Sequence, residues 1–311
     1  MELIITLVSK LAAMLLYVVV GYIIVKVGVL SAEESKPFSK LVVYVLQPCL
    51  IVSAFQIEVT PERLRGFLAV LVFSSLIYLV WIVLTKVFKK PFGLTRIDEA
   101  TLVYSNVGNL VLPLIEMTLG REMVFYASAV QIPFNLLIWT HGYQTIRGEK
   151  GFHIKGALTN TNVIAIFVGL ILMITGIHIP DIPATALQGF SSMVGPASML
   201  VVGMVITKRD LRSVFTFKKA WLILAGRLVV FPLVAILLLF VSGFLRIFPA
   251  FAPMLMAGMM SLSAPPSSTV SQLAVVYDVE PVESSIYNVL GTFLCIVTMP
   301  AVIALFQAVF M

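Results

Sequence analysis

The sequence predicts an all-α integral membrane protein with ten transmembrane helices, arranged as two inverted repeats of five helices each. Three features lead to this fold class: the composition, a succession of long apolar segments, and two polar, proline-interrupted stretches inside those segments. Of the 311 residues, 60% are hydrophobic and 12% are charged, and the mean hydropathy is +1.06. Soluble globular domains carry about 25% charged residues, and outer-membrane barrels alternate polar with apolar residues. The composition therefore excludes a soluble domain and argues against a barrel.

Ten segments are apolar over a length close to the roughly 20 residues that a membrane-crossing helix needs. In order, they cover residues 11–30, 38–55, 67–88, 100–119, 123–143, 162–179, 182–206, 220–244, 251–277 and 282–310. The first is too long for a signal peptide, so we expect it to be retained as a span. Cys49 and Cys295 fall within spans without a metal-type spacing partner, and we expect them to pack as small apolar residues.

The basic residues predict the orientation of the chain. Of the 21 Lys and Arg residues that outweigh the acids to give the net charge of +6, fifteen lie in or next to loops after odd-numbered spans, and four lie on the opposite side. Cytoplasmic loops carry an excess of Lys and Arg. The odd loops are therefore expected in the cytoplasm, with both termini outside a plasma or inner membrane. The charge is thus expected to set topology and contact membrane lipid, with no nucleic-acid partner.

An internal repeat is indicated by two independent alignments. Residues 47–50 of the second span align with residues 195–198 of the seventh at an offset of 148, and both segments contain proline. The fourth and ninth spans align at an offset of 158, which pairs Ser105 with Ser263 and Asn109 with Ser267. Five-helix repeats would cover residues 1–147 and 148–311 with opposite topology, an arrangement typical of secondary transporters.

The fourth and ninth spans are expected to break near the middle of the membrane. Residues 104–113 and 261–269 are rich in Gly, Pro, Ser and Asn. Proline removes a backbone donor, and freed backbone groups must be buried in protein or line a wet cavity. The second half of a broken helix presents a partially positive N-terminus that suits a carboxylate. The expected substrate-binding positions are Ser105, Asn106, Gly108, Asn109 and Pro113, together with Ser263, Pro265, Pro266, Ser267 and Ser268.

Further polar residues inside spans are candidates for the same site. Gln131 and Asn135 are four residues apart and share one helix face. Ser53 and Ser198 lie just past prolines, and Gln47 lies just before Pro48. For each of them, as for the broken stretches, a structural role as a kink cap or an inter-helix hydrogen bond is the alternative.

Two charged residues within spans could serve in coupling. Glu116 could carry a proton or cation, or it could simply reach the outer interface. Arg227 could attract an anionic substrate, or it could snorkel to the cytoplasmic face. The three His residues show no metal-ligand spacing, and the sequence carries no catalytic or nucleotide-binding motif. We expect neither an enzyme nor a cofactor.

At these positions the sequence resembles the auxin efflux carrier family. The fourth span has an Asn followed seven residues later by a Pro, and the ninth ends in Tyr-Asp with a Pro three residues on. The matching residues are Asn106, Pro113, Leu114, Pro265, Tyr277, Asp278 and Pro281. The long central cytoplasmic loop of the long plant members is missing.

The resemblance implies a mechanism as well as a fold. The fourth and ninth spans would cross in a mobile unit of spans 3–5 and 8–10, and spans 1, 2, 6 and 7 would form a scaffold that often dimerises. An elevator-like movement would carry small organic anions, such as mono- or dicarboxylates or auxin-like acids, and the family's polar site residues support Gln131. The alternatives are a sodium-coupled symporter of the bile-acid type and a channel or structural membrane protein.

Overall fold

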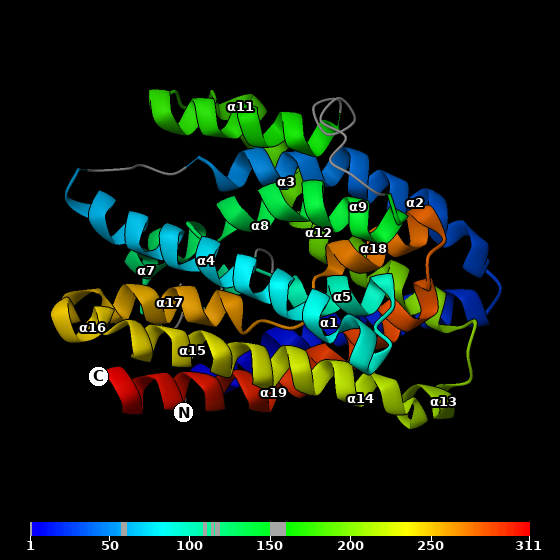
Figure 1. Ribbon diagram of the computed structural model, residues 1–311. Helices are drawn as coiled ribbons and strands as arrows, with labels where there is room; N and C mark the ends of the chain where they lie inside the picture. The colour runs from blue at the N-terminus through cyan, green and yellow to red at the C-terminus, as the bar shows by residue number, and fades with distance from the viewer. Residues whose placement is uncertain (1, 57–60, 108–110, 113–114, 116–118, 150–159) are drawn as a thin grey trace.

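The computed structural model describes residues 2–56, 61–107, 111–112, 115, 119–149 and 160–311, which form helices joined by turns and short connections (Figure 1). The first half of the chain contains α1 (Glu2–Lys26), α2 (Ser35–Leu41), α3 (Gln47–Ala54), α4 (Pro61–Phe92), α5 (Arg96–Val103), α7 (Arg121–Ser128), α8 (Gln131–Leu137) and α9 (Tyr143–Arg147). The second half contains α11 (Thr161–Thr175), α12 (Asp181–Ile206), α13 (Leu211–Thr216), α14 (Lys218–Ala225), α15 (Phe231–Ser242), α16 (Phe244–Ile247), α17 (Ala252–Leu262), α18 (Ser268–Tyr277) and α19 (Pro281–Phe310).

Six helical stretches of the described residues are long and apolar enough to cross a membrane. They are Ala32–Ala54, Arg63–Phe92, Glu122–Arg147, Asp181–Ile206, Lys218–Ser242 and Pro281–Phe310. Shorter apolar helices cover Ala12–Lys26, Thr161–Thr175 and Pro249–Leu262. The all-α class with several apolar spans is therefore confirmed for the described part of the chain, whereas the ten-span inverted repeat stays a prediction.

Two of these stretches continue through a proline by means of a π-helical turn. Val42–Leu46 forms such a turn just before Pro48, and Gly226–Val230 forms one just before Pro232. Proline lacks the N–H that closes a helical hydrogen bond and crowds the preceding turn. A local widening of the helix accommodates it, so both stretches keep the length needed to span a membrane.

One group of helices is held together by close backbone contact. α1 packs along α12, and α3 packs against both α12 and α11. A Cβ on Gly21 of α1 would lie 2.1 Å from the carbonyl oxygen of Leu200, and one on Gly203 of α12 would lie 2.0 Å from that of Val18. Only glycine fits at these two positions. The group corresponds to predicted spans 1, 2, 6 and 7, whose role as a scaffold stays a prediction.

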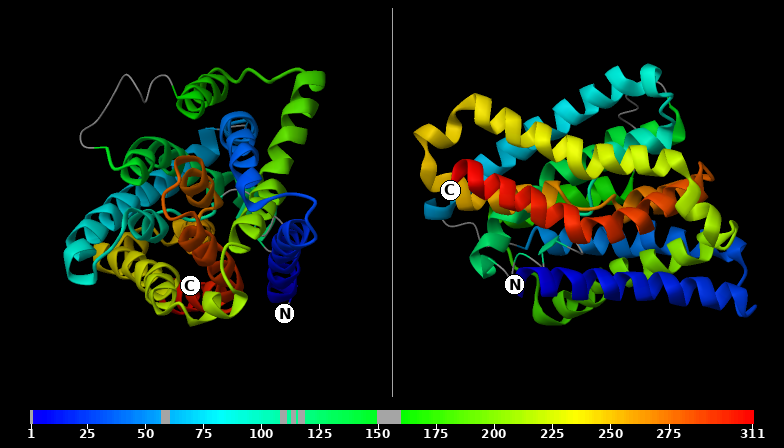
Figure 2. Two further views of the ribbon diagram at one scale, coloured as in Figure 1. Left: turned by 90° about the vertical axis from the view of Figure 1, so that its right-hand side faces the viewer. Right: turned by 90° about the horizontal axis from the view of Figure 1, so that it is seen from below.

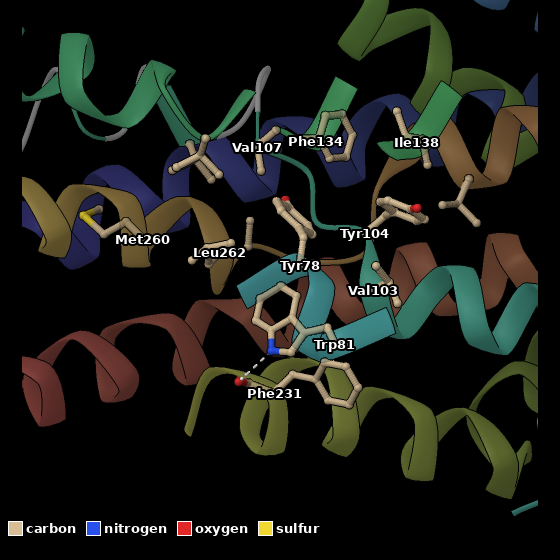
Figure 3. Packing of buried hydrophobic residues seen from close by; sticks show 14 of the residues in the cluster. Tyr78, Trp81, Val103, Tyr104, Val107, Phe134, Ile138, Phe231, Met260 and Leu262 are labelled. Atoms are coloured by element: carbon tan, nitrogen blue, oxygen red, sulfur yellow. Dashed lines mark hydrogen bonds between the residues drawn. The ribbon is translucent and has the colours of Figure 1, made fainter. Parts of the chain in front are cut away.

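The other helices pack around buried aromatic side chains (Figure 3). Trp81 of α4 is fully buried, and its indole N–H donates to the carbonyl oxygen of Phe231 at 3.2 Å. Tyr78, one turn earlier, meets Trp81 edge to face with ring centroids 5.6 Å apart. Tyr104, which follows α5, stacks against Tyr78 at 6.4 Å. This core therefore joins α4, α15 and the segment after α5.

The two termini lie at the same end of the helical bundle, together with α7 and α16 (Figure 1). Figures 1 and 2 show α13 at the opposite end, where α2 begins and α9 ends. That opposite end carries Lys36, Arg147 and Arg212. We call it the basic end, and it matches the side that the Lys and Arg count assigns to the cytoplasm. Which side faces the cytoplasm stays a prediction.

Candidate functional site

Both predicted helix breaks are present in the structure, and the broken segments meet. α5 ends at Val103, and Tyr104 is extended with φ −97° and ψ 120°. Ser105, in this extended segment, forms an antiparallel bridge with Pro266, which lies between α17 and α18. The Asn106 N–H donates to the carbonyl oxygen of Pro265 at 2.8 Å, and the Ser267 N–H donates to that of Tyr104 at 3.0 Å. We call this junction the crossover.

The proline pair explains why the chain crosses at this point. Pro265 and Pro266 have no N–H to continue α17, and their carbonyls are satisfied by Asn106 and by Asn288 of α19, whose Nδ2 lies 3.4 Å from the Pro266 oxygen. α19 makes room for the ring with a glycine, because a Cβ on Gly291 would lie 2.4 Å from Pro266 Cδ. The backbone groups freed by one broken segment are thus satisfied largely by the other and by α19.

Arg227 binds the C-terminal ends of both half-helices that lead into the crossover. Its guanidinium donates to the carbonyl oxygens of Leu102 and Val103 at 3.3 and 3.5 Å. On the other half-helix it donates to those of Leu262 and Ala264 at 2.6 and 3.2 Å. Arg227 is 0% exposed, so the expectation that it could snorkel to the surface is wrong. A positive charge at two helix C-termini is electrostatically favourable.

A small cavity lies beside the crossover, where α3, α8 and the start of α18 converge. Six residues expected to bind substrate line it together: Gln47, Asn106, Gln131, Asn135, Ser267 and Ser268. Its other lining residues are Leu50, Ile51, Val107, Phe134 and Thr269. Four of these five are apolar, and the sequence does not single them out because apolar residues are ordinary inside a span. The cavity therefore has a polar side built from amides and hydroxyls and an apolar side.

The polar side presents hydrogen-bond donors without a charged side chain. Gln131 is 4% exposed, and its Nε2 has no hydrogen-bond partner among the described residues. Ser267 is the N-cap of α18, and its hydroxyl accepts from the Thr269 N–H at 3.2 Å. The partially positive start of α18 therefore opens beside an unpaired amide donor, an arrangement that can bind an acceptor such as a carboxylate.

Comparison with known families agrees with this architecture. Residues 6–303 match the membrane transport protein family, to which the auxin efflux carriers belong. The chain is a member of this family. The resemblance found in the sequence is thus confirmed, and the protein is a multi-pass membrane transporter from a family of transporters rather than enzymes. No curated protein matches the sequence as a relative.

Several residues expected to bind substrate have other contacts in this transporter. The Ser105 hydroxyl lies 3.2 Å from the Tyr78 hydroxyl, and the Ser263 hydroxyl donates to the Met259 carbonyl at 2.7 Å. Ser198 is buried on α12, where its carbonyl accepts from Gln272 Nε2 at 3.2 Å. These three serines do not line the cavity, and neither does Ser53, which is half-buried on α3. The other expected residues that do not line it are Pro265, Pro266 and Arg227. Gly108, Asn109, Pro113 and Glu116 lie outside the described residues.

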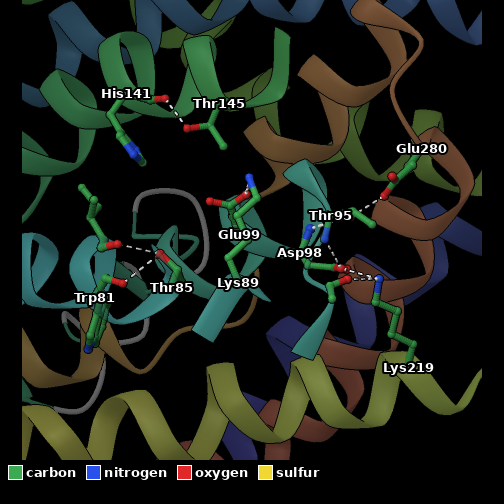
Figure 4. A network of polar contacts seen from close by, with 12 residues as sticks. Trp81, Thr85, Lys89, Thr95, Asp98, Glu99, His141, Thr145, Lys219 and Glu280 are labelled. Atoms are coloured by element: carbon green, nitrogen blue, oxygen red, sulfur yellow. Dashed lines mark hydrogen bonds and ion pairs between the residues drawn. The ribbon is translucent and has the colours of Figure 1, made fainter. Parts of the chain in front are cut away.

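A buried polar cluster lies at the start of α5, where the sequence predicts only a loop between two spans (Figure 4). Asp98 is 0% exposed and pairs with Lys219 Nζ of α14 at 2.5 Å. Its carboxylate also accepts from the Tyr287 hydroxyl at 2.7 Å and the Thr95 N–H at 2.7 Å. The Thr95 hydroxyl donates to Glu280 at 2.6 Å. The signal was available, since Thr95 and Asp98 have the spacing of a helix capping box.

Proposed function

We propose that this transporter carries small organic anions, such as mono- or dicarboxylates or auxin-like acids, and that they bind in the cavity beside the crossover. The observation that carries the proposal is the Nε2 of Gln131, which has no hydrogen-bond partner among the described residues. A buried donor without a partner is costly, and a carboxylate would satisfy it. The start of α18 adds a partial positive charge. Leu50, Ile51 and Phe134 offer an apolar wall for the carbon skeleton.

The arrangement of the two helix groups supports an elevator-type alternating-access mechanism. The cavity lies between α3, from the group that packs on α12, and the segments of the crossover, from the other group. We call this other group, made of α4, α5, α7–α9 and α14–α19, the crossover group. Its movement along α3 and α12 would carry a bound anion between the two sides of the membrane. We propose that the group containing α1, α3, α11 and α12 stays fixed and forms a homodimer interface. In this proposal the protein lies in the plasma or inner membrane, and both termini face outward.

A sodium-coupled symporter was the principal alternative, and Arg227 argues against a cation near the crossover. Sodium in secondary transporters is held by unwound carbonyls and half-helix C-termini. Here the guanidinium of Arg227 already binds four such carbonyl oxygens, and the Ser263 hydroxyl donates within its own helix. We therefore propose transport that needs no sodium at this position.

Binding and flux of labelled carboxylates test the proposal. We expect Gln131→Leu, which keeps the side-chain size and removes the donor, to weaken binding by about tenfold or more, since hydrogen bonds to charged groups contribute about 1.5–3 kcal/mol. Thermal-shift assays with acetate, malate and indole-3-acetate, with and without sodium, measure binding, and proteoliposome uptake measures transport. Gln188→Leu is the matched control, because Gln188 is exposed on α12, away from the cavity.

Two outcomes would count against this function. Unchanged binding and uptake in both Gln131→Leu and Gln131→Glu would remove the site assignment, since a carboxylate at position 131 should repel an anion. Uptake that lacks substrate counterflow and does not saturate would indicate a channel instead of a carrier. A sodium requirement for the thermal shift would favour the symporter.

A further inference from the structure

Three tyrosine hydroxyls from three separate helical stretches form a continuous chain of hydrogen bonds. The Tyr277 hydroxyl, at the end of α18, donates to the Tyr143 hydroxyl of α9 at 2.9 Å. The Tyr44 hydroxyl, in the turn between α2 and α3, lies 2.9 Å from the Tyr277 hydroxyl. Because Tyr277 uses its proton on Tyr143, Tyr44 is the donor in the remaining bond.

Arg147 fixes two of these rings to each other. Its guanidinium donates to the Tyr143 hydroxyl at 2.9 Å and lies 5.2 Å from the ring centroids of both Tyr143 and Tyr277. The two rings meet edge to face, with centroids 5.4 Å apart. Tyr143, Arg147 and Tyr277 thus form one rigid cluster, and a hydrogen bond joins it to Tyr44.

The three stretches that supply the tyrosines also supply walls of the cavity. Tyr277 lies nine residues beyond Ser268, and Tyr143 lies eight beyond Asn135, which correspond to about 12–14 Å of helix. Tyr44 precedes Ile51 by seven residues, or about 10 Å. All three separations run from the cavity toward the basic end. The tyrosines therefore meet in the space between the cavity and that end of the protein.

We propose that Tyr44, Tyr143 and Tyr277 form a gate that closes the cavity toward the basic end and opens when the crossover group moves. This inference rests on the proposed alternating-access function. The bond between Tyr44 and Tyr277 crosses from the α3 stretch to the crossover group, whereas Tyr143, Arg147 and Tyr277 stay together within that group. A single hydrogen bond between partly exposed hydroxyls changes an equilibrium by about threefold to tenfold. The bond between Tyr44 and Tyr277 therefore stabilises the closed state of the gate without preventing its opening.

Accessibility of the cavity tests the gate without any knowledge of the substrate. A cysteine at Leu50 reports access, in a background with Cys49→Ala and Cys295→Ala. Inside-out and right-side-out membrane vesicles are treated with an impermeant thiol reagent. An Arg212→Cys variant, exposed on α13, identifies the vesicles whose basic end faces the reagent. In those vesicles we expect Tyr277→Phe and Tyr44→Phe to raise the labelling rate at position 50 about threefold or more.

Tyr17→Phe is the matched control, because Tyr17 of α1 and Tyr44 are both 39% exposed and no hydrogen bond of the Tyr17 hydroxyl is found within the described residues. Labelling that is equal in the control and in both gate variants would overturn the proposal. Tyr44→Phe, at the periphery, keeps the test valid if Tyr277→Phe does not fold.

Cross-linking tests whether the gate must open during transport. With cysteines at positions 44 and 277, a short bis-methanethiosulfonate cross-linker, which joins the two thiols through disulfides, should abolish uptake of labelled malate and indole-3-acetate, and reduction of those disulfides should restore it. Unchanged uptake by the cross-linked protein would show that the gate does not open during transport. If neither acid is transported at all, the labelling result still decides the gate, and the failure belongs to the proposed substrate class.

Discussion

Arg227 is a buried cation whose hydrogen-bond partners among the described residues are all backbone carbonyls, and its Nε has no partner among those residues. Among the described residues no carboxylate lies within ion-pair distance of it, and its planar fork instead donates to four carbonyl oxygens. Its guanidinium also lies 4.9 Å from the centroid of the Trp81 ring. Burying an unpaired charge is expensive. The cost is offset here because two helix C-termini, each with a partial negative charge, converge on one side chain.

We expect Arg227→Met to destabilise the protein by at least about 1–3 kcal/mol, because it removes the donor from four buried carbonyl oxygens and a single unsatisfied buried group already costs that much. Arg227→Lys should restore part of that loss, because an ammonium group keeps the charge but cannot match the geometry of the guanidinium fork. Melting temperature in detergent micelles is the measurement, with Arg246→Met as the exposed control. Equal melting temperatures for the Met and Lys variants would mean that the charge itself contributes nothing.

At the scale of single elements, the sequence predicts where helices break but only some of the side chains that face the cavity. Proline pairs and clustered Ser and Asn mark a break wherever they occur in a span. Orientation depends on the partner segment. Ser105 and Asn106 are neighbours in an extended segment, where successive side chains point to opposite sides, so Asn106 lines the cavity and Ser105 contacts Tyr78. Only the pairing with Pro266 determines which of the two faces which way.

The crossover pairing makes a prediction at Ser267. This residue has φ −64° and ψ 129°, so proline fits its backbone conformation. Ser267→Ala removes the cap of α18 and should cost about 1 kcal/mol. Ser267→Pro also removes the N–H that donates to the Tyr104 carbonyl oxygen. The loss of stability should then be larger by about 1–3 kcal/mol, because this buried carbonyl is left unsatisfied. Thermal unfolding of both variants measures the difference. If the two variants were equally stable, the bond across the crossover would carry no stability.

At the scale of the whole molecule, composition predicted a membrane protein because so few charges cannot cover a soluble surface. The charged side chains that are buried in the described part of the protein have structural roles that composition cannot reveal. Arg227 joins two half-helices, and the pair of Asp98 and Lys219 joins α5 to α14. Each arrangement includes a partner more than 100 positions away in the chain, since Leu102 is 125 positions from Arg227 and Asp98 is 121 positions from Lys219. Periodicity and spacing describe local structure only, so sequence reasoning could not find these partners.

The close packing of α1 on α12 gives a prediction at the same scale. A Cβ on Gly203 would lie 2.0 Å from the carbonyl oxygen of Val18, which is backbone and cannot move without its helix. Gly203→Ala should therefore push the two helices apart and cost about 1–3 kcal/mol, as overpacking does. Gly189 is on the same helix with nothing within 4 Å of its Cβ position, so Gly189→Ala should leave stability unchanged or raise it by up to about 1 kcal/mol.

The Gly203→Ala variant also tests whether the contact between α1 and α12 influences ligand binding in the cavity. Gly203 does not line the cavity, so carboxylate affinity measured on the folded fraction should be equal in Gly203→Ala and in the parent protein, even though the melting temperature falls. Melting temperatures and binding isotherms in the same micelles provide both values. A loss of affinity that follows the loss of stability would show that the α1–α12 contact shapes the cavity. The two helix groups would then not act as separate units, and the elevator mechanism would lose its fixed element.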